Sequence, residues 1–318
     1  MSGPPPRDRA AVVCFHGVTE RPGDPERRPN QLTVGSFLAQ VEQLAREREL
    51  LSLPRLAELL RSGRPLGTPK GVVTFDDGYR NVLTVAQPLL RDRGVPFATF
   101  VCTRNAATGE RLPTDLLRAA LWGTRERAVR LDGPGLGELS LAGDAQRRAA
   151  VAAVTVALKR SPWAAGRALL AQLAALLGDE PVPPGDDDAP LTWEEVAELA
   201  RTGTAIGSHG HEHVILHDAQ PPAEIARQLR RSKWEIEERI GPCLAFAYPN
   251  GGRADIAPAA ERAARACGYE LAFAATPALV DRTSPRMRLP RLFAAADAPG
   301  LQRRLVAAAT PAPEPERA

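Results

Sequence analysis

The stretch Gly71-Val72-Val73-Thr74-Phe75-Asp76-Asp77-Gly78-Tyr79 is an apolar run that ends in two adjacent carboxylates and a glycine. Its first five residues are β-branched, aromatic or small, as in a buried strand, so Asp76 and Asp77 lie where that strand becomes a loop. Adjacent carboxylates repel each other unless a cation accepts one of them. A metal ion is the simplest such cation, and it leaves the second carboxylate free to act as a base. An ordinary Asp-Gly turn is the alternative.

A second stretch, Ile206-Gly207-Ser208-His209-Gly210-His211-Glu212-His213, holds three of the five histidines of the chain. Neutral imidazole is the commonest metal ligand. His209 and His213 have the i, i+4 spacing that sets two rings on one face if a helix begins there. The cluster therefore indicates a metal site, with a structural histidine cluster at a turn as the alternative. His209-x-His211 also resembles the His-x-His of metal-dependent amidohydrolases, but that motif normally ends the first strand of a barrel.

Apolar strands alternate with helical patterns along the chain, which is typical of a parallel sheet or barrel. We expect strands at 10–15, 71–75, 96–102, 205–207, 244–248, 269–274 and 287–293. Four polar motifs follow such strands directly: His16, Asp76-Asp77, His209 to His213, and Pro249-Asn250-Gly251. Parallel strands bring these motifs to one rim, where α/β barrels hold their active sites. About seven strands predict a distorted β/α barrel rather than an open doubly wound sheet.

One long interval interrupts this alternation. Residues from about 104 to 190 predict a helical insertion that borders the site, with helices at 116–122, 145–158 and 163–177. The whole domain is expected at 10–302, between a disordered lead at 1–9 and a disordered tail at 303–318. Asp186-Asp187-Asp188 lie in a proline-rich loop and are interpreted as a solvated linker. Ser36 and Thr192 are expected as helix N-caps, and Thr192 forms a capping box with Glu195.

Composition limits the function without choosing one. The 318 residues suffice for one large α/β domain, and the net charge of +3 comes from scattered basic residues, so nucleic-acid binding is not indicated. The four cysteines show no C-x-x-C and suit a reduced compartment. We see no signal peptide and no apolar run near the roughly 18 residues of a membrane span. A cytoplasmic protein is expected, and the oligomeric state stays open.

The two motifs together carry a resemblance. Thr74-Phe75-Asp76-Asp77-Gly78, followed by Gly207-Ser208-His209 and by His213, resembles the first two motifs of the polysaccharide deacetylase family, which contains the NodB-like domain of carbohydrate esterase family 4. The resemblance extends from about Ala11 to about Phe293 and implies a distorted (β/α)7 barrel. Phe15-His16 resembles the strand end that supplies the general acid in the circularly permuted branch of this family.

Roles follow from the resemblance by motif position. It implies that Asp77, His209 and His213 bind one divalent metal ion, with Zn²⁺ first and Co²⁺, Ni²⁺ or Fe²⁺ as alternatives, in an open catalytic site. Asp76 would take a proton from the attacking water, and His16 would protonate the leaving nitrogen.

The third family motif is altered. Ala247-Tyr248-Pro249-Asn250-Gly251 stands where the family often has Arg-x-Pro-Tyr, and Ala247 occupies the arginine position. Main-chain N–H groups near Asn250 are the expected oxyanion donors, since they do not depend on side-chain identity. Arg291, after a late strand, could pair with Asp76 in place of the missing arginine. Tyr248 is interpreted either as part of the sugar site or as a packed aromatic, and His217 as a surface residue.

The resemblance implies a metal-dependent hydrolase that removes an acetyl group from an N-acetylated sugar or polysaccharide, which is the expected partner. Two alternatives stay open. One is a deformylase or deacylase of an intracellular amide that is not a polysaccharide. The other is a carbohydrate-binding homologue with weakened or lost turnover, which the missing motif arginine suggests.

Overall fold

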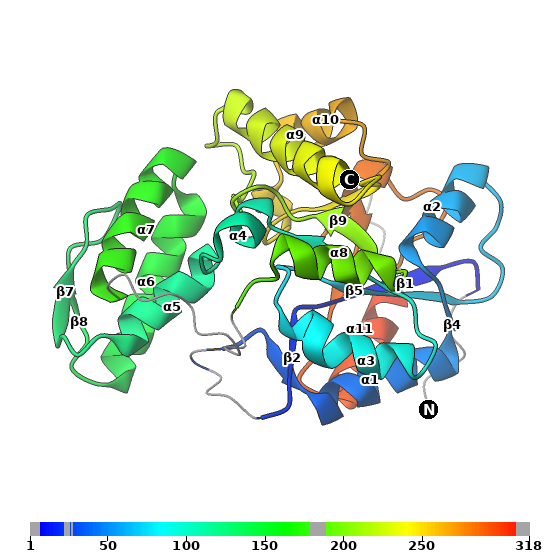
Figure 1. Ribbon diagram of the computed structural model, residues 1–318, viewed down its shortest axis with the longest axis horizontal. Coiled ribbons are helices and arrows are strands. Elements are labelled where there is room, and N and C mark those ends of the chain that lie inside the picture. Colours follow the sequence, from blue (N-terminus) through cyan, green and yellow to red (C-terminus); the bar gives the residue numbers. More distant parts are fainter. Residues whose placement is uncertain (1–6, 22–25, 27, 178–188, 310–318) are drawn as a thin grey trace, which may run out of the picture.

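The computed structural model describes residues 7–21, 26, 28–177 and 189–309, and its centre is a sheet of parallel strands (Figure 1). The sheet order is β12-β11-β10-β9-β6-β5-β1-β13, with β4 (Glu49–Leu50) paired to β5 off this path. The strands of the path are β1 (Ala10–Phe15), β5 (Lys70–Phe75), β6 (Phe97–Val101), β9 (Ala205–Ser208), β10 (Ala245–Ala247), β11 (Leu271–Ala274), β12 (Leu289–Pro290) and β13 (Leu292–Phe293).

The two ends of this path meet. β12 pairs with β11 through Phe273 and Leu289, and β13 pairs with β1 through Val13 and Leu292. Arg291 alone separates β12 from β13, so the segment 289–293 joins the first and last strands of the order. The sheet is therefore a nearly closed barrel, and with 289–293 taken as one strand the predicted distorted (β/α)7 barrel is confirmed.

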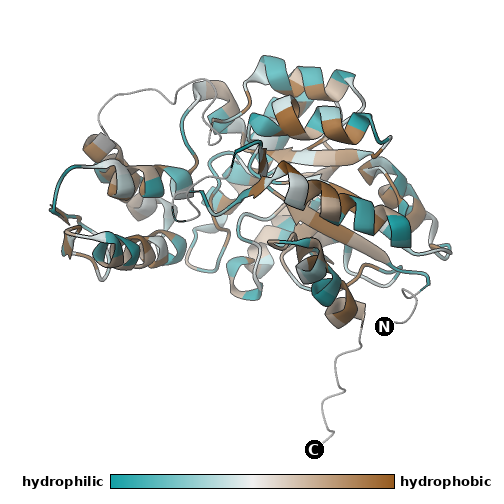
Figure 2. Cartoon of the chain, turned by 90° about the horizontal axis from the view of Figure 1, so that it is seen from below, coloured by the Kyte–Doolittle hydropathy of each residue, from teal (hydrophilic) through white to brown (hydrophobic). Residues whose placement is uncertain are grey.

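Helices surround the barrel and cover its apolar strands (Figure 2). They are α1 (Val34–Glu47), α2 (Leu53–Ser62), the π-helix η1 (Val82–Ala86), α3 (Gln87–Arg91), α8 (Trp193–Arg201), α9 (Pro222–Arg239), α10 (Pro258–Ala266) and α11 (Ala298–Ala309), with single 3₁₀ turns at η2 (Arg253–Asp255) and η3 (Arg286–Arg288). A short parallel pair, β2 (Gly17–Thr19) and β3 (Gln31–Thr33), follows β1. None of the described helices is long and apolar enough to cross a membrane.

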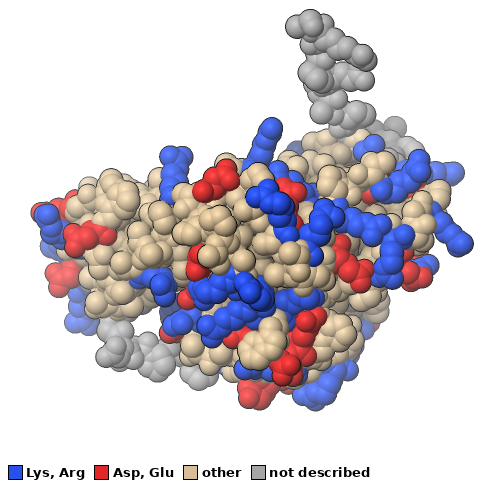
Figure 3. All heavy atoms as spheres, turned by 90° about the horizontal axis from the view of Figure 1, so that it is seen from above, with Lys and Arg blue, Asp and Glu red and all other residues tan. Residues whose placement is uncertain are grey.

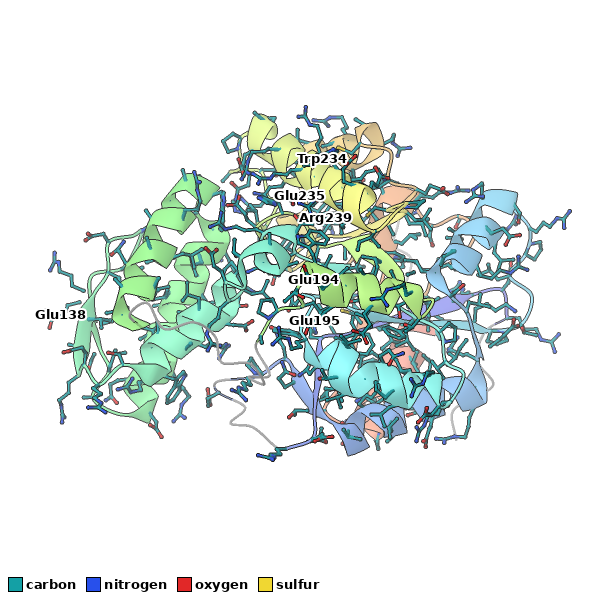
Figure 4. All side chains as sticks on the ribbon, in the orientation of Figure 1. Glu138, Glu194, Glu195, Trp234, Glu235 and Arg239 are labelled. Atoms are coloured by element: carbon teal, nitrogen blue, oxygen red, sulfur yellow. The ribbon has the colours of Figure 1, made fainter. Side chains whose placement is uncertain are left out.

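The insertion forms a lobe at one side of the barrel (Figure 1). It contains α4 (Thr103–Thr108), α5 (Pro113–Gly123), the antiparallel pair β7 (Ala128–Arg130) and β8 (Glu138–Ser140), α6 (Asp144–Arg160) and α7 (Trp163–Leu177). These elements share an apolar cluster of their own, which includes Leu117, Val154 and Leu173. Glu138 marks the outer end of the lobe, away from the barrel (Figure 4). The helical insertion is thus a packed unit, and the β7–β8 hairpin was not predicted.

Three boundary predictions need correction. Residues 303–309 belong to α11 and pack through Leu305 and Ala308, so the predicted disordered tail begins too early. Residues 7–9 are also placed, since the Asp8 N–H donates to the Gly67 carbonyl. The N-cap of α1 is Thr33, whose hydroxyl accepts from the Ser36 N–H, and not Ser36 itself. The capping box of Thr192 and Glu195 is confirmed. Residues 1–6, Asp186 to Asp188 and 310–318 lie outside the described residues.

Candidate active site and metal centre

The carboxyl ends of the barrel strands open into one cavity of about 820 Å³. Four of the strands deliver side chains there: His16 follows β1, Asp76 and Asp77 follow β5, His209 follows β9, and Tyr248 follows β10. The predicted convergence at one rim follows from the parallel order, because parallel strands end at the same edge. The insertion forms one wall of the cavity through α5, α6 and Trp163.

Asp77, His209 and His213 meet at the bottom of the cavity. Asp77 Oδ1 lies 3.4 Å from His209 Nε2 and 3.3 Å from His213 Nε2. No helix begins at His209; the segment is a loop in which His213 has a φ of 52°, and that turn brings the two rings to a centroid distance of 4.9 Å. Asp77 has a φ of 74°. Two non-glycine residues in the left-handed region are strained, which is common where side chains must be aimed at a functional site.

This cluster fits a divalent metal ion. Asp77 Oδ1 is buried and has no hydrogen-bond partner in the described structure, which is costly unless a cation or proton joins it. His209 Nδ1 lies 2.8 Å from the Ala247 carbonyl oxygen and donates to it, so Nε2 faces Asp77 with its lone pair. Tetrahedral zinc with ordinary Zn–N and Zn–O bonds sets its ligand atoms about 3.4 Å apart. The contact to Ala247 orients the ring as an outer-shell partner does.

The charges in the cluster favour a bound cation. Burial raises the pKa of Asp77, but the adjacent His209 and His213 rings outweigh it and hold that pKa well below its usual range. Burial lowers the pKa of His209, whereas the Asp76 and Asp77 carboxylates raise it, with a net increase. The site thus attracts positive charge at the point where the three ligand atoms converge. Their role as metal ligands stays a prediction.

Asp76 is paired with Arg291. Both of its oxygens accept from the guanidinium, Oδ1 from Nη1 and Oδ2 from Nη2, at 2.7 Å each, and both residues are buried. Burial raises the pKa of Asp76, but the positive charge of Arg291 lowers it by more, so that the net pKa is about 2. Arg291 thus makes the contact expected of a substitute for the motif arginine. Its carboxylate partner stays ionised across the neutral pH range.

His16 lines the same cavity and stacks on Phe293, with ring centroids 5.8 Å apart and planes 19° apart. Burial lowers the pKa of His16, and the charges of Asp77 and Asp76 raise it, with a net decrease. Cys14, His16 and Asp76 form a second group whose potential ligand atoms lie within 4.8 Å of one another. Because both oxygens of Asp76 are engaged by Arg291, the Asp77 group is the better metal site.

The residues of the third motif have different roles in the structure. Tyr248 and Asn250 line the cavity, but the Tyr248 hydroxyl donates to the Met287 carbonyl at 3.0 Å, so the ring is a packed aromatic at the cavity edge. The Gly251 N–H donates to the Pro249 carbonyl at 2.7 Å and is committed within the turn. Gly251 has a φ of 67°, and a Cβ there would lie 2.9 Å from the Ala275 nitrogen, so only glycine fits. Asn250 is therefore the member best placed to supply an oxyanion donor.

Two histidines play other parts. His211 turns away from Asp77, and its Nδ1 lies 3.1 Å from Glu235 Oε2, on α9, and 2.9 Å from Thr103 Oγ1. Glu235 projects from α9 as labelled in Figure 4. This placement does not support the His-x-His alternative. His217 is buried, and its Nδ1 accepts from the Ala219 N–H, so the surface interpretation was wrong.

The sequence did not reveal how the insertion is tied to the site. The Tyr79 hydroxyl donates to Asp115 of α5 at 2.7 Å, and Trp163 Nε1 donates to Glu212 at 3.1 Å. Lys159 of α6 donates to Asn250 Oδ1 at 2.6 Å. These contacts join residues on different elements, so no short sequence pattern predicts them. The one indication in the sequence is that Tyr79 and Glu212 are next to the two motifs.

The chain is similar to known deacetylases in part of its sequence and in its whole fold. Residues 138–272 match the family model described as polysaccharide deacetylase, a stretch that contains His209, His213 and Tyr248 but not Asp76 or Asp77. The comparison with curated proteins found no match to this chain. Its fold is similar to that of Streptococcus pyogenes deacetylase PplD, solved in complex with acetate (TM-score 0.61, 14% identity, 94% of this chain and 99% of that chain covered).

Two further solved structures share the fold. They are IcaB from Ammonifex degensii (TM-score 0.60, 17% identity, 95% of this chain and 97% of that chain) and a de-N-acetylase from Aggregatibacter actinomycetemcomitans (TM-score 0.56, 14% identity, 93% and 99%). At these identities the likeness shows the fold alone. Residues 138–272 are thus similar to the polysaccharide deacetylase family model, and the chain as a whole shares the fold of these solved deacetylases.

Proposed function

We propose that the protein is a metal-dependent N-deacetylase that hydrolyses the acetamide of an N-acetylated sugar. The observation that carries the proposal is the convergence of Asp77, His209 and His213 on one point, with a separate ionised carboxylate, Asp76, beside them. Two imidazoles and one carboxylate leave coordination positions for water and substrate, as in catalytic rather than structural sites.

Each residue has a role in this proposal. Asp77, His209 and His213 would hold the metal ion, for which Zn²⁺ is the first candidate and Co²⁺, Ni²⁺ and Fe²⁺ are the others. When bound, such an ion supplies an activated water and polarises the acyl carbonyl. Asp76 accepts the proton of the attacking water, and Arg291 keeps its carboxylate ionised and fixed in orientation. His16, which lies close to Asp76, donates a proton to the departing nitrogen, and the main chain at Asn250 stabilises the oxyanion.

The binding-only alternative loses part of its motivation. It was based on Ala247 at the position of the motif arginine, and Arg291 supplies a buried guanidinium to the same carboxylate. A change of acyl group from acetyl to formyl keeps every role above and differs only in the room required next to the metal site. It is therefore best tested together with acetyl substrates.

A release assay tests the proposal. Acetate and formate release would be measured over N-acetylated and N-formylated sugars, sugar nucleotides and chitin or peptidoglycan fragments, with Zn²⁺, Co²⁺ or Ni²⁺ added. We expect acetate release that chelation removes and metal restores. Activity that survives both chelation and Asp76→Asn would refute the proposal, and stoichiometric metal binding without any release would favour the binding-only alternative.

A further inference from the structure

The outer part of the cavity is lined by positively charged side chains from separate elements. Arg118 projects from α5, Lys159 from α6 and Arg304 from α11, and all three line the cavity that contains the candidate metal ligands. They come from parts of the chain far apart in sequence, so the sequence contains no local cluster of basic residues that would predict this group. The face of the molecule seen in Figure 3, by contrast, mixes acidic and basic side chains.

These three cations contact neutral oxygens. Lys159 Nζ donates to Asn250 Oδ1 at 2.6 Å, Arg118 Nη1 to the Glu26 carbonyl at 2.5 Å, and Arg304 Nη1 to the Phe293 and Ala294 carbonyls at 2.8 Å. Within the described residues none of the three is in an ion pair with a carboxylate. The carbonyl contact engages one of the five N–H groups of the Arg118 guanidinium, and a lysine ammonium has three donors.

The carboxylates of the cavity are occupied elsewhere. Asp76 is engaged by Arg291, Asp77 lies between two imidazoles, and Asp115 accepts from the Tyr79 hydroxyl. The outer cavity therefore carries an excess of positive charge in a partly enclosed space, where charges interact more strongly than on an open surface.

Lys159 and Arg118 also repel each other. Burial lowers the pKa of Lys159, the charge of Asp255 raises it and the charge of Arg118 lowers it, with a net decrease. An anion bound between the two cations would offset that repulsion and raise the pKa of Lys159, which favours its protonated, positively charged form. A neutral sugar polymer gains nothing from such an arrangement, and an already deacetylated, cationic one is repelled by it.

We propose that Lys159 and Arg118 form an anion-binding subsite, and that the substrate is an N-acylated sugar bearing a phosphate or carboxylate group. The inference rests on the proposed deacetylase function and narrows its substrate class. Both anions fit the same donors, since guanidinium and ammonium groups bind either. The subsite lies on the insertion, so the insertion would set specificity while the barrel performs the hydrolysis.

The test compares three substrates: N-acetylglucosamine, N-acetylglucosamine 1-phosphate and N-acetylmuramic acid, which carry no anion, a phosphate and a carboxylate. We expect kcat/KM for acetate release to be higher for an anionic sugar than for the neutral one. Lys159→Met and Arg118→Met should each reduce that ratio about tenfold to a hundredfold, as expected for a lost charge-assisted hydrogen bond. Whichever anion shows the loss is the one recognised.

Two variants serve as controls. Lys159→Arg keeps the charge and should retain most of the preference, whereas Arg160→Met, which removes a neighbouring exposed cation of α6, should leave the ratio unchanged. No preference for either anionic sugar, or a preference that both Met variants leave intact, overturns the inference.

A binding measurement separates this inference from the proposed function. Calorimetric titration of N-acetylglucosamine 1-phosphate and N-acetylmuramic acid into the full chain needs no turnover. Binding that depends on Lys159, together with no acetate release from any sugar, supports the subsite and rejects the deacetylase. Equal release from neutral and anionic sugars supports the deacetylase and rejects the subsite.

Discussion

Arg291 and Asp76 form a buried bidentate ion pair although 215 positions separate them in the chain. Arg291 occupies the single position between β12 and β13, where the barrel closes, and Asp76 ends the β5 strand. The closing segment of the barrel thus also fixes the orientation of the candidate base. The pair links the stability of the fold to the geometry of the site.

Arg291→Met should destabilise the protein by about 3–5 kcal/mol, because it leaves the Asp76 carboxylate buried without its partner. Urea unfolding would measure this loss, and acetate release should fall with it. The double variant Arg291→Met/Asp76→Asn removes both charges and should recover much of the stability while remaining inactive. A single variant as stable as the original protein, with activity intact, would show that Arg291 does not orient Asp76.

Asp77→Asn should abolish stoichiometric metal binding, because it replaces the one carboxylate of the cluster by a weak, neutral ligand. The metal content of purified protein after dialysis against Zn²⁺ provides the measurement. Thermal unfolding serves as the control: the fold should persist, since the change keeps the size and shape of the side chain and leaves the bidentate pair of Arg291 with Asp76 intact. Full metal occupancy in the variant would contradict the assignment of Asp77 as a ligand.

The matched substitutions His213→Gln and His211→Gln should differ in metal binding. His213 Nε2 faces Asp77, whereas His211 contacts Glu235 and Thr103. We expect the first to lose metal and the second to retain it while losing stability, by about 1–3 kcal/mol for a disturbed buried hydrogen-bond network. Metal analysis and urea unfolding on both variants would show this. The reverse result would revive the His-x-His interpretation.

Phe293→Ala should raise KM more than it lowers kcat. Phe293 is 38% exposed, lines the cavity and stacks on His16, so it offers an apolar ring face to the substrate and covers one face of the imidazole. Aromatic contacts of this kind contribute about 0.5–1.5 kcal/mol beyond burial. Steady-state kinetics on an N-acetylated sugar provide the measurement. The exposed Val306→Ala, on α11, is the control and should leave both constants unchanged.

The sequence determined the barrel and its motif positions because both are periodic or local. Residues 10–15 are apolar at every position and form β1 as predicted, and the Asp76-Asp77 pair follows its strand immediately. Parallel order then places every strand-end motif at one rim, whatever the details of packing. The capping box at Thr192 was readable for the same reason, since its partners are three residues apart.

Tertiary structure decided everything that depends on partners distant in the chain. The sequence left Arg291 as one possible partner of Asp76, and barrel closure brings the two together. The sequence expected a helix to align His209 with His213, whereas a left-handed turn at His213 does so. Lys159 and Arg118 carry no motif at all and become neighbours of the site only through the packing of the insertion. Local interactions are encoded by spacing along the chain, but a contact between remote residues exists only after the core has packed, so that no short pattern reports it.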